Sequence, residues 1–327
     1  MNHTEPQRNF GDEEDIRTEV RSLISSLPSD TNIQGKKLCN YQGCWYYYKN
    51  LQAVLDYQKH FKPLDSDIIV TSYPKSGTTW LKALTVALLH RSEDGLQSHP
   101  LTSDSPHGLV PFLEMDLYHK SSTPDLTKLS SSPRLFSTHM PLHTLREPLK
   151  DSPCKIVYVC RNVKDVLVSL WHFRSKIGKK EAERSGLESI IESFCKGVDN
   201  YGPIWDHVLS YWKGSLEDPK HVLFMRYEDL KEEPYAQVMR LAEFLDCPFT
   251  EQEIRTGSVE KISDLCSLSS LSNLDINKTG ISWNNVDHSI FFRKGEVDDW
   301  KNHLTTEMAN KIDMIMDEKF QGSGLKM

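Results

Sequence analysis

The chain has 327 residues, 38% of them hydrophobic and 26% charged, which is the composition of a globular protein and excludes collagen-like, low-complexity and disordered classes. The formal net charge of −7 argues against a general nucleic-acid coat, so any anion site must be a local basic pocket. No stretch approaches the roughly 18 apolar residues of a membrane span, and we therefore expect no membrane contact.

Cysteine usage and the N-terminal residues predict a cytoplasmic protein. The seven cysteines include no CxxC pair, which argues against a disulfide framework and a structural zinc site. The first twenty residues contain six acidic and two basic side chains, unlike a signal or transit peptide. We interpret residues 1–18 as a mobile acidic arm and residues 19–327 as one domain.

From Asp67 onwards, apolar strands alternate with helix-period segments, which predicts an α/β fold with a mainly parallel central sheet flanked by helices. The strands are predicted at residues 67–72, 134–138, 155–160 and 221–226. Helices are predicted at about 78–90 and 164–173, and a third contains Val238, Leu241, Ala242 and Leu245 at helical spacing. No internal repeat or long linker divides the chain, so we expect a single domain.

The run Tyr73-Pro-Lys-Ser-Gly-Thr-Thr-Trp80, between the first strand and its helix, has the chemistry of a phosphate-binding loop. Gly77 permits a turn and lets backbone N–H groups approach an anion. Lys75 adds a charge, Thr78 and Thr79 add hydroxyl groups, and the helix N-terminus adds its dipole. The only glycine follows the lysine, so the run is not a Walker A loop. An ordinary turn with a helix cap is the alternative interpretation.

Three segments in this order resemble the cytosolic sulfotransferases. The run just described resembles the loop that binds the 5′-phosphosulfate group of that family's donor. Cys160-Arg161-Asn162 with Ser169 resembles a strand, loop and helix that contact the donor's 3′-phosphate. Phe292-Arg-Lys-Gly-Glu-Val-Asp-Asp-Trp300 resembles the RKGxxGDW segment that holds the same phosphate. The resemblance implies a P-loop-like sulfotransferase fold.

The resemblance extends from about Leu23 to Leu325 and is strongest to plant members. Leu23-Ile-Ser-Ser-Leu-Pro28 and Tyr41-Gln-Gly-Cys-Trp45 are similar to segments of flavonol and brassinosteroid sulfotransferases. Near the C-terminus, Thr306 and Asn310 replace the Val and Glu of the family's dimerisation motif. We therefore expect a monomer.

The donor implied by the resemblance is 3′-phosphoadenosine 5′-phosphosulfate, which needs two cationic sites because it carries phosphate at both ends of an adenosine. Arginine suits the second site, since its planar fork can bind phosphate through two hydrogen bonds. The expected donor-binding residues are Lys75, Ser76, Gly77, Thr78 and Thr79 in the loop, Arg161, Ser169, Arg293, Lys294 and Gly295 at the 3′-phosphate, and Trp80, Tyr227, Cys266, Ser267 and Leu268 at the adenine. Two positions depart from the family pattern: Leu268 replaces a Phe and cannot stack on the base, and Asp298 replaces a Gly.

His139 is the predicted catalytic base. It follows a predicted strand and matches the family's THLP-type motif, whereas His172 and His207 resemble packed or helix-face residues. An imidazole can take a proton from a hydroxyl group near neutral pH. Ser137 stands where many animal members have a Lys, so Lys75 is expected to provide more of the charge stabilisation alone.

The resemblance implies transfer of a sulfuryl group to a hydroxyl of a small acceptor, with His139 as base, Lys75 and the Ser76–Thr79 segment stabilising the leaving phosphate, and no metal. The acceptor pocket is expected to be lined by loops around Pro111–Tyr118, Trp171–Phe173 and Asn284–Phe291, whose aromatic residues favour a flat hydrophobic acceptor. A flavonol or flavonoid glycoside is the first expectation, and a brassinosteroid-type steroid alcohol is the alternative.

Two other classes remain open at this point. A nucleotide kinase or ATPase is one, because His221–Asp229 could imitate a Walker B strand, although the Walker A order is missing. A nucleotide-binding module without catalysis is the other, and the presence of both Lys75 and His139 argues against it. The basic run Arg174–Arg184 is interpreted as a loop near the 3′-phosphate or a solvated face.

Overall fold

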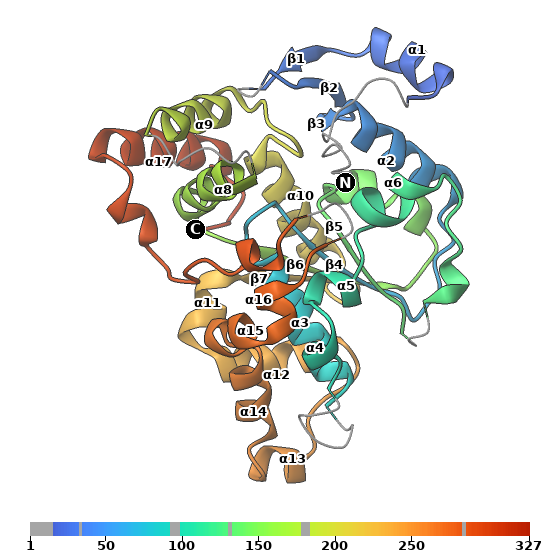
Figure 1. The fold of residues 1–327 in the computed structure, drawn as a ribbon, viewed down its shortest axis with the longest axis vertical. Coiled ribbons are helices and arrows are strands. Elements are labelled where there is room, and N and C mark those ends of the chain that lie inside the picture. Colours follow the sequence, from blue (N-terminus) through green and yellow to red (C-terminus); the bar gives the residue numbers. More distant parts are fainter. Residues whose placement is uncertain (1–15, 33–34, 92–98, 130–132, 178–183, 283–285) are drawn as a thin grey trace, which may run out of the picture.

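The structure is a computed structural model that describes residues 16–32, 35–91, 99–129, 133–177, 184–282 and 286–327. Its centre is a parallel four-stranded sheet in the order β5-β4-β6-β7 (Figure 1). The strands are β4 (Ile68–Ser72), β5 (Leu135–Thr138), β6 (Lys155–Cys160) and β7 (Val222–Arg226). The predicted α/β class is confirmed, and each strand begins within one residue of its predicted start.

Side chains of this sheet alternate between two apolar clusters, because successive residues of a strand point to opposite faces. Ile69, Tyr158 and Phe224 belong to one cluster, whereas Val70 and Val157 belong to the other. The first cluster also contains residues of α2 (Tyr48–His60), α8 (Val163–Ile177), α9 (Arg184–Lys196), α10 (Ile204–Glu217) and α17 (Thr306–Phe320). The second contains residues of α3 (Thr78–Leu89), α12 (Pro234–Phe244) and α14 (Ser258–Leu265). Figure 1 shows helices on both sides of the sheet, as expected for buried parallel strands.

Shorter helices and turns connect these layers. Before β6 they are α1 (Thr18–Ser26), α4 (Pro100–Ser103), α5 (Pro106–Leu109), the π-helical turn η3 (Leu113–Leu117), α6 (Tyr118–Lys120), η4 (Leu126–Lys128), α7 (Leu142–Leu145) and η5 (Glu147–Leu149). After β7 they are α11 (Tyr227–Glu232), α13 (Glu251–Arg255), α15 (Leu268–Asn273), α16 (Asp275–Thr279), η6 (His288–Phe291) and η7 (Asp299–Asn302).

A second, antiparallel sheet near the N-terminus was not predicted. It consists of β1 (Ser29–Thr31), β2 (Lys37–Tyr41) and β3 (Cys44–Tyr47), and it lies at the top of Figure 1. Gln42 and Gly43 form the two-residue turn between β2 and β3, with φ of 54° and 80°, the positive values that a type I′ hairpin turn requires.

Strand order in the parallel sheet indicates where a ligand binds. From β4 the chain goes to β5 on one side of the sheet and then returns to β6 on the other. In open parallel sheets, ligands bind outside the carboxyl ends of the strands at such a reversal. The segment after β4 is the run Tyr73–Trp80, so the predicted anion-binding loop stands at this point.

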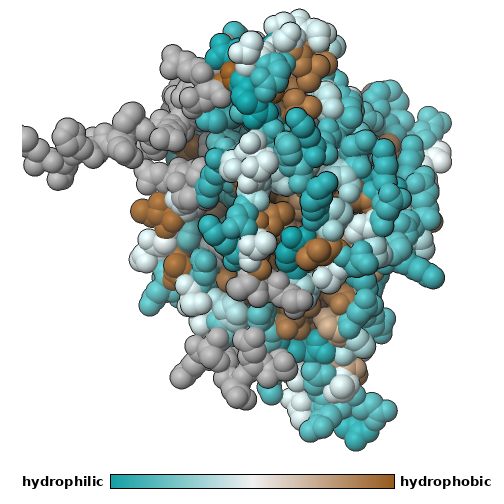
Figure 2. Space-filling view, turned by 90° about the vertical axis from the view of Figure 1, so that its right-hand side faces the viewer, coloured by the Kyte–Doolittle hydropathy of each residue, from teal (hydrophilic) through white to brown (hydrophobic). Residues whose placement is uncertain are grey.

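Residues 1–15 of the expected acidic arm lie outside the described residues. Ile16 is buried, and the Arg17 guanidinium lies 2.6 Å from the Asp56 carboxylate of α2. The described end of the arm therefore packs against the domain. No helix in the described ranges is long and apolar enough to cross a membrane. Figure 2 shows one face, on which hydrophilic residues predominate and apolar residues form separate small patches.

Candidate active site

A cavity of about 820 Å³ collects residues from the carboxyl ends of all four parallel strands. Lys75 follows β4, His139 follows β5, Arg161 follows β6 and Tyr227 follows β7, and all four line it. Every predicted site residue except Ser76 lines this cavity. The side chain of Ser76 is buried in the turn instead.

The loop after β4 has the strained backbone of an anion cradle. Lys75 and Gly77 have φ of 70° and 113°, and the Ser76 N–H donates to the Tyr73 carbonyl at 3.1 Å. A Cβ at Gly77 would lie 2.8 Å from Cδ2 of Tyr227, so only glycine fits without displacing that ring. The hydroxyl groups of Ser72 and Thr78 lie 2.5 Å apart and join the strand to the first turn of α3.

Lys75 is a cation without a carboxylate partner among the described residues. Its Nζ lies 3.9 Å from the centroid of the Phe173 ring. Burial, followed by the positive charges of Arg161 and Arg293, lowers the pKa of Lys75 to about 7. An anion bound in the loop would favour the charged form again, because an opposite charge raises the pKa of an ammonium group.

One ring nitrogen of His139 is hydrogen-bonded to the protein, and the other keeps a lone pair. Nδ1 lies 2.7 Å from the Ser72 carbonyl, which can only accept, so Nδ1 carries the hydrogen and Nε2 keeps its lone pair. Its backbone N–H donates to Oε1 of buried Glu114 at 2.9 Å. Burial lowers the pKa of His139 to about 3, so the ring is neutral near pH 7. The same burial weakens it as a base, and negative charge beside the ring would raise its pKa.

Buried carboxylates hold the cations that were expected at the 3′-phosphate. Nη1 of Arg293 and Nζ of Lys294 lie 2.6 and 2.7 Å from the two oxygens of Asp299. Burial alone would raise the pKa of Asp299. Hydrogen bonds from Lys294 and Arg293 outweigh this effect and hold that pKa below its usual range. Asp299 therefore stays ionised and fixes both cations. Gly295 adjoins this pair with φ of 66°, and Ser169 of α8 lines the same cavity.

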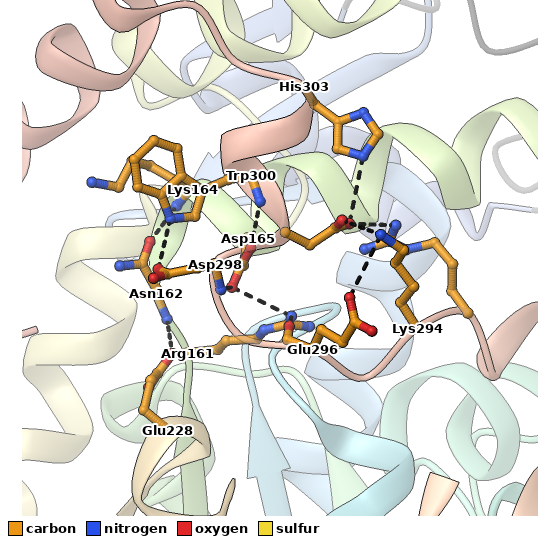
Figure 3. Close-up of polar contacts among 12 residues, drawn as sticks. Arg161, Asn162, Lys164, Asp165, Glu228, Lys294, Glu296, Asp298, Trp300 and His303 are labelled. Carbon is orange, nitrogen blue, oxygen red and sulfur yellow. Dashed lines mark hydrogen bonds and ion pairs between the residues drawn. The ribbon is translucent and has the colours of Figure 1, made fainter. Parts of the chain in front are cut away.

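Asp165 organises the turn beside these cations. Its carboxylate accepts the backbone N–H groups of Asp298 and Trp300 at 2.9 Å each (Figure 3). Oδ2 of Asp165 also lies 3.5 Å from Nη2 of Arg161, which donates to the Glu296 carbonyl at 2.6 Å. The turn and Arg161 are thus fixed against each other.

Asp298 keeps the turn that the family's glycine would form. It has φ of 66° and ψ of 14°, the left-handed conformation that glycine adopts most easily. Its carboxylate accepts hydrogen bonds from Nε1 of Trp300 and Nζ of Lys301. Aspartate tolerates this conformation better than most residues, and here its side-chain bonds offset the strain.

The residues expected at the adenine line the same cavity. The rings of Trp80 and Tyr227 meet edge to face with centroids 5.2 Å apart, and the Arg161 guanidinium lies 4.4 Å from the Tyr227 centroid. Cys266 is buried after α14, and Ser267 caps α15 by accepting the Ser270 N–H at 3.1 Å. Leu268 packs against Gly295, where an added Cβ would lie 3.0 Å from Cδ2 of Leu268.

The composition of this cavity fits a nucleotide with phosphate at the 5′ and 3′ positions of its ribose. Its cations are grouped at the loop and around Asp299, close enough for Arg161 and Arg293 to lower the pKa of Lys75, and the Trp80 and Tyr227 rings form an aromatic cleft in the same cavity. Nε1 of Trp80 and Nε of Arg161 are buried donors without a partner in the described parts of the chain. Buried donors are rarely left unpaired in folded proteins, so a ligand acceptor in this cleft would satisfy them.

Several buried polar residues near the loop and His139 were not predicted. Oγ1 of Thr138 donates to Oε2 of Glu114 at 2.9 Å, and the Tyr201 ring lies 5.5 Å from that of His139. Lys82 is fully buried, and its Nζ donates to the Val110 carbonyl at 2.8 Å. A single lysine inside the apolar run of α3 was the one signal in the sequence for this group.

The other predicted histidines have different positions. His207 is a packed core residue, as expected, bonded to the hydroxyl of Tyr158 at 3.1 Å and to the His139 carbonyl at 2.9 Å. His172 was expected to be packed or on a helix face, and it lies on α8 but also lines the cavity.

The three expected acceptor segments all contribute to the cavity. Pro111, Phe112, Phe173 and Phe291 line it, but much of the first two segments is helical and not loop. Residues 284 and 285 lie outside the described residues, as do residues 178–183 of the basic run. Within that run, Arg174 pairs with Asp199 at 2.6 Å, and Lys176 lines the cavity.

The acids after β7 are bound to protein groups. Oε1 of Glu228 accepts the Asn162 N–H at 2.8 Å, and Asp229 lies 3.4 Å from Arg226. Across the described ranges, no cluster of three or more metal-ligating side chains is assembled.

Comparison with known proteins agrees with this geometry. Residues 65–324 match the family described as sulfotransferase domain. Cytosolic sulfotransferase 1 of Arabidopsis thaliana is 63% identical over 321 residues, with 96% of each chain covered. The crystal structure of a putative steroid sulphotransferase from Arabidopsis thaliana has a TM-score of 0.76 and 41% identity, covering 98% of this chain and 99% of that one. A mouse sulfotransferase complexed with PAP has a TM-score of 0.65 and 26% identity, covering 88% and 95%.

Proposed function

The chain belongs to the sulfotransferase family, and on that premise we propose that it moves the sulfuryl group of 3′-phosphoadenosine 5′-phosphosulfate to a hydroxyl group of a small, flat, hydrophobic acceptor. A flavonol or a flavonoid glycoside is the preferred acceptor class. Membership of this enzyme family sets aside the kinase and the non-catalytic module.

One observation carries the proposal: His139 and the loop of Lys75 share one cavity, and Nε2 of His139 keeps a lone pair. The acceptor hydroxyl loses its proton to that nitrogen, and its oxygen then attacks the sulfur in line. Lys75 and the N–H and hydroxyl groups of Ser76–Thr79 stabilise the negative charge that develops on the leaving phosphate. The bond between sulfur and the phosphate oxygen breaks as the new bond between sulfur and oxygen forms.

The nucleotide end supplies binding and orientation. Arg161, Arg293 and Lys294 bind the 3′-phosphate of the donor, and Gly295 and Ser169 approach it without a bulky side chain. Tyr227 and Trp80 contact the adenine, with Cys266, Ser267 and Leu268 at its edge. These contacts lie apart from His139, so they hold the donor without taking part in proton transfer.

Aromatic rings around His139 support a flat acceptor. The Phe112 centroid lies 4.8 Å from that of His139, and the Phe173 and Phe291 centroids lie 5.8 Å apart. Ring faces favour planar aromatic ligands, which stack at such separations. A brassinosteroid-type steroid alcohol is the second candidate, because the Arabidopsis structural relative is described as a putative steroid sulphotransferase.

An assay with labelled donor across flavonols, flavonoid glycosides, steroid alcohols, hydroxyjasmonates and desulfoglucosinolates tests the proposal. We expect the highest kcat/KM with a flavonol or its glycoside. Sulfation of steroids alone would replace the preferred acceptor class, and no turnover with any hydroxyl compound would contradict the reaction itself.

We infer the localisation of the enzyme from its named relatives and its oligomeric state from helix α17. The curated relatives are named cytosolic sulfotransferases, and we place this chain in the cytosol as well. Thr306 and Asn310 are exposed on α17, and we propose a monomer at micromolar concentration. Light scattering that shows a stable dimer, broken by Thr306→Lys, would contradict this.

A further inference from the structure

A chain of hydrogen bonds runs from a buried lysine to the proposed phosphosulfate loop. Nζ of Lys82 lies 3.1 Å from Nδ1 of His107, and Nε2 of His107 lies 2.9 Å from Oγ1 of Thr79. Lys82 and Thr79 are both on α3, one turn apart, and His107 on α5 bridges them. No part of the proposed mechanism requires Lys82 or His107.

The environment of Lys82 suits an ammonium group that acts only as a donor. Nζ lies 3.6 Å from the centroid of the Phe112 ring and donates to the Val110 carbonyl at 2.8 Å. Ser137 Oγ donates to the same carbonyl at 3.2 Å. Lys82 forms no ion pair within 4 Å in the described parts of the chain, and the negative charges of Asp116 and Glu114 only partly offset its burial. A bound anion nearby would add to this stabilisation of the charged form.

The ammonium group determines which nitrogen of His107 carries hydrogen. Burial, followed by the charges of Lys82 and Lys75, lowers the pKa of His107 well below its ordinary value, so the ring is neutral. Burial lowers the pKa of Lys82 to about 7, and an anion bound in the loop would raise it again, so Nζ is an ammonium group in the anion complex. Because an ammonium group can only donate, Nδ1 of His107 must accept in that complex, and the ring hydrogen resides on Nε2. Nε2–H then donates to Oγ1 of Thr79, and the hydroxyl hydrogen of Thr79 is left for another acceptor.

A ligand in the cavity would be the acceptor for the hydroxyl hydrogen of Thr79. Thr79 lines the cavity, and its recorded side-chain bond among the described residues is the one to His107. We propose that Lys82 and His107 are positioning residues that direct the hydroxyl hydrogen of Thr79 toward the anion in the loop. This inference rests on the proposed function of the loop in binding the donor.

A double-mutant cycle tests whether Lys82 acts through Thr79. Thr79→Val removes the hydroxyl at nearly constant shape, and Lys82→Met keeps the side-chain length beside Phe112. We expect each variant to lower kcat/KM for the donor by about 10- to 100-fold, the effect of one hydrogen bond to a charged group. The double variant should be no worse than Thr79→Val alone, since both changes remove the same bond. Losses that multiply would overturn the proposal.

Two further variants keep the test independent of folding defects. His107→Phe preserves the ring that lies 4.2 Å from the Phe291 centroid but has no nitrogen, and it should reproduce Lys82→Met in both Thr79 backgrounds. If Lys82→Met does not fold, this second cycle decides. Thr85→Val is the matched control, because Thr85 is a buried threonine of the same helix whose hydroxyl bonds to the Leu81 carbonyl. It should leave kcat/KM unchanged.

The tautomer of His107 can be measured without any turnover. Nitrogen-15 NMR reports which ring nitrogen carries hydrogen, and loss of a signal in His107→Phe assigns it. We expect the Nε2–H form in the wild type with the product nucleotide bound, and a shift toward the Nδ1–H form in Lys82→Met under the same conditions. A nucleotide-bound wild-type ring protonated on Nδ1 would overturn the proposal. Since no acceptor is needed, this result is distinguishable from a wrong acceptor class.

Discussion

The two groups of cations in the cavity are held in opposite ways. At the proposed 3′-phosphate site, which we call the nucleotide end, Arg293 and Lys294 share the buried carboxylate of Asp299. At the loop end, neither Lys75 nor Lys82 forms an ion pair in the described parts of the chain, and both lie against aromatic rings. The cations around Asp299 are therefore fixed and neutralised, whereas Lys75 and Lys82 have pKa values lowered to about 7 and form no ion pair among the described residues.

The two kinds of cation suit different tasks, binding an unchanging phosphate and stabilising charge that develops during the reaction. A paired cation keeps its charge and position at every pH of interest, which suits a phosphate that does not change during turnover. A buried, unpaired cation gains stability when negative charge appears beside it, which suits a leaving group on which charge develops. Substitutions at the two ends should consequently affect different kinetic constants.

His139→Ala should give the largest effect and confine it to turnover. We expect kcat to fall by roughly two to four decades, the range for loss of a general base. Affinity for the product nucleotide should stay near that of the wild type, because the proposed phosphate contacts do not involve the imidazole. The loss should be smaller for phenols of lower pKa, which need less help in losing the proton.

A matched control for this substitution is His143→Ala. His143 is exposed, and its Nε2 lies 2.8 Å from the Gln42 carbonyl. It should retain normal turnover. A His139→Ala protein that is stable, binds nucleotide and turns over normally would rule out the proposed base, whereas joint loss of stability and nucleotide affinity would assign His139 a structural role.

Arg293→Ala should produce the next largest effect, at the nucleotide end. It removes a charge-assisted hydrogen bond made in both the ground and the transition state, so KM for the donor should rise about 10- to 100-fold. KM for the acceptor and kcat should change little. Arg255→Ala, at an exposed arginine paired with Glu251, is the control. An unchanged donor KM would remove Arg293 from the site.

Lys75 should couple nucleotide binding to proton uptake. Its pKa of about 7 in the free enzyme rises when an anion binds, so the complex holds more protons than the separate partners. Above pH 7 the uptake should approach one proton, and affinity should fall by up to about tenfold per pH unit. Calorimetry in buffers of different ionisation enthalpy measures this uptake. Lys75→Arg, which stays charged, should abolish the Lys75 contribution, and a wild type without uptake above pH 7 would contradict the proposed protonation change.

Substitutions of Asp298 should have the smallest effect, and we expect them to change the stability of the turn rather than the reaction. Asp298→Ala keeps a Cβ in the left-handed conformation but loses the side-chain bonds, so we expect destabilisation by about 1–2 kcal/mol. Asp298→Gly loses the same bonds but also relieves about 1 kcal/mol of strain, so it should be the more stable variant. Denaturant unfolding measures both. Equal stability of the two variants would show that the conformation carries no strain.

The parallel sheet and the loop could be predicted from the sequence because their signals are local. Strands such as Ile68–Ser72 are buried on both faces and therefore appear as continuous apolar runs. The loop combines glycine, lysine and hydroxyl groups between a strand and a helix. In contrast, the residues of β1, Ser29–Thr31, are all exposed and carry no apolar pattern.

The missed polar residues depend on contacts between distant segments. Tyr201 lies beside His139 although 62 positions separate them in the sequence. Glu114 is buried because it accepts hydrogen bonds from the β5 end, and nothing in its own segment reveals that partner. Lys82 and His107 meet through the packing of α5 on α3. Periodicity identifies a helix face, but not the side chain that another element places against it.

The N-terminal residues contribute to the cavity from outside the matched sulfotransferase domain. The region that matches the sulfotransferase domain begins at residue 65, yet Lys36, Tyr47 and Asn50 line the cavity before it. The backbone of β3 also anchors Tyr201, whose N–H donates to the Trp45 carbonyl at 2.7 Å. We therefore expect variation in the first 64 residues to reshape this wall of the cavity while the proposed nucleotide contacts stay intact. A chimera that exchanges only this segment between relatives is the natural unit for redirecting specificity.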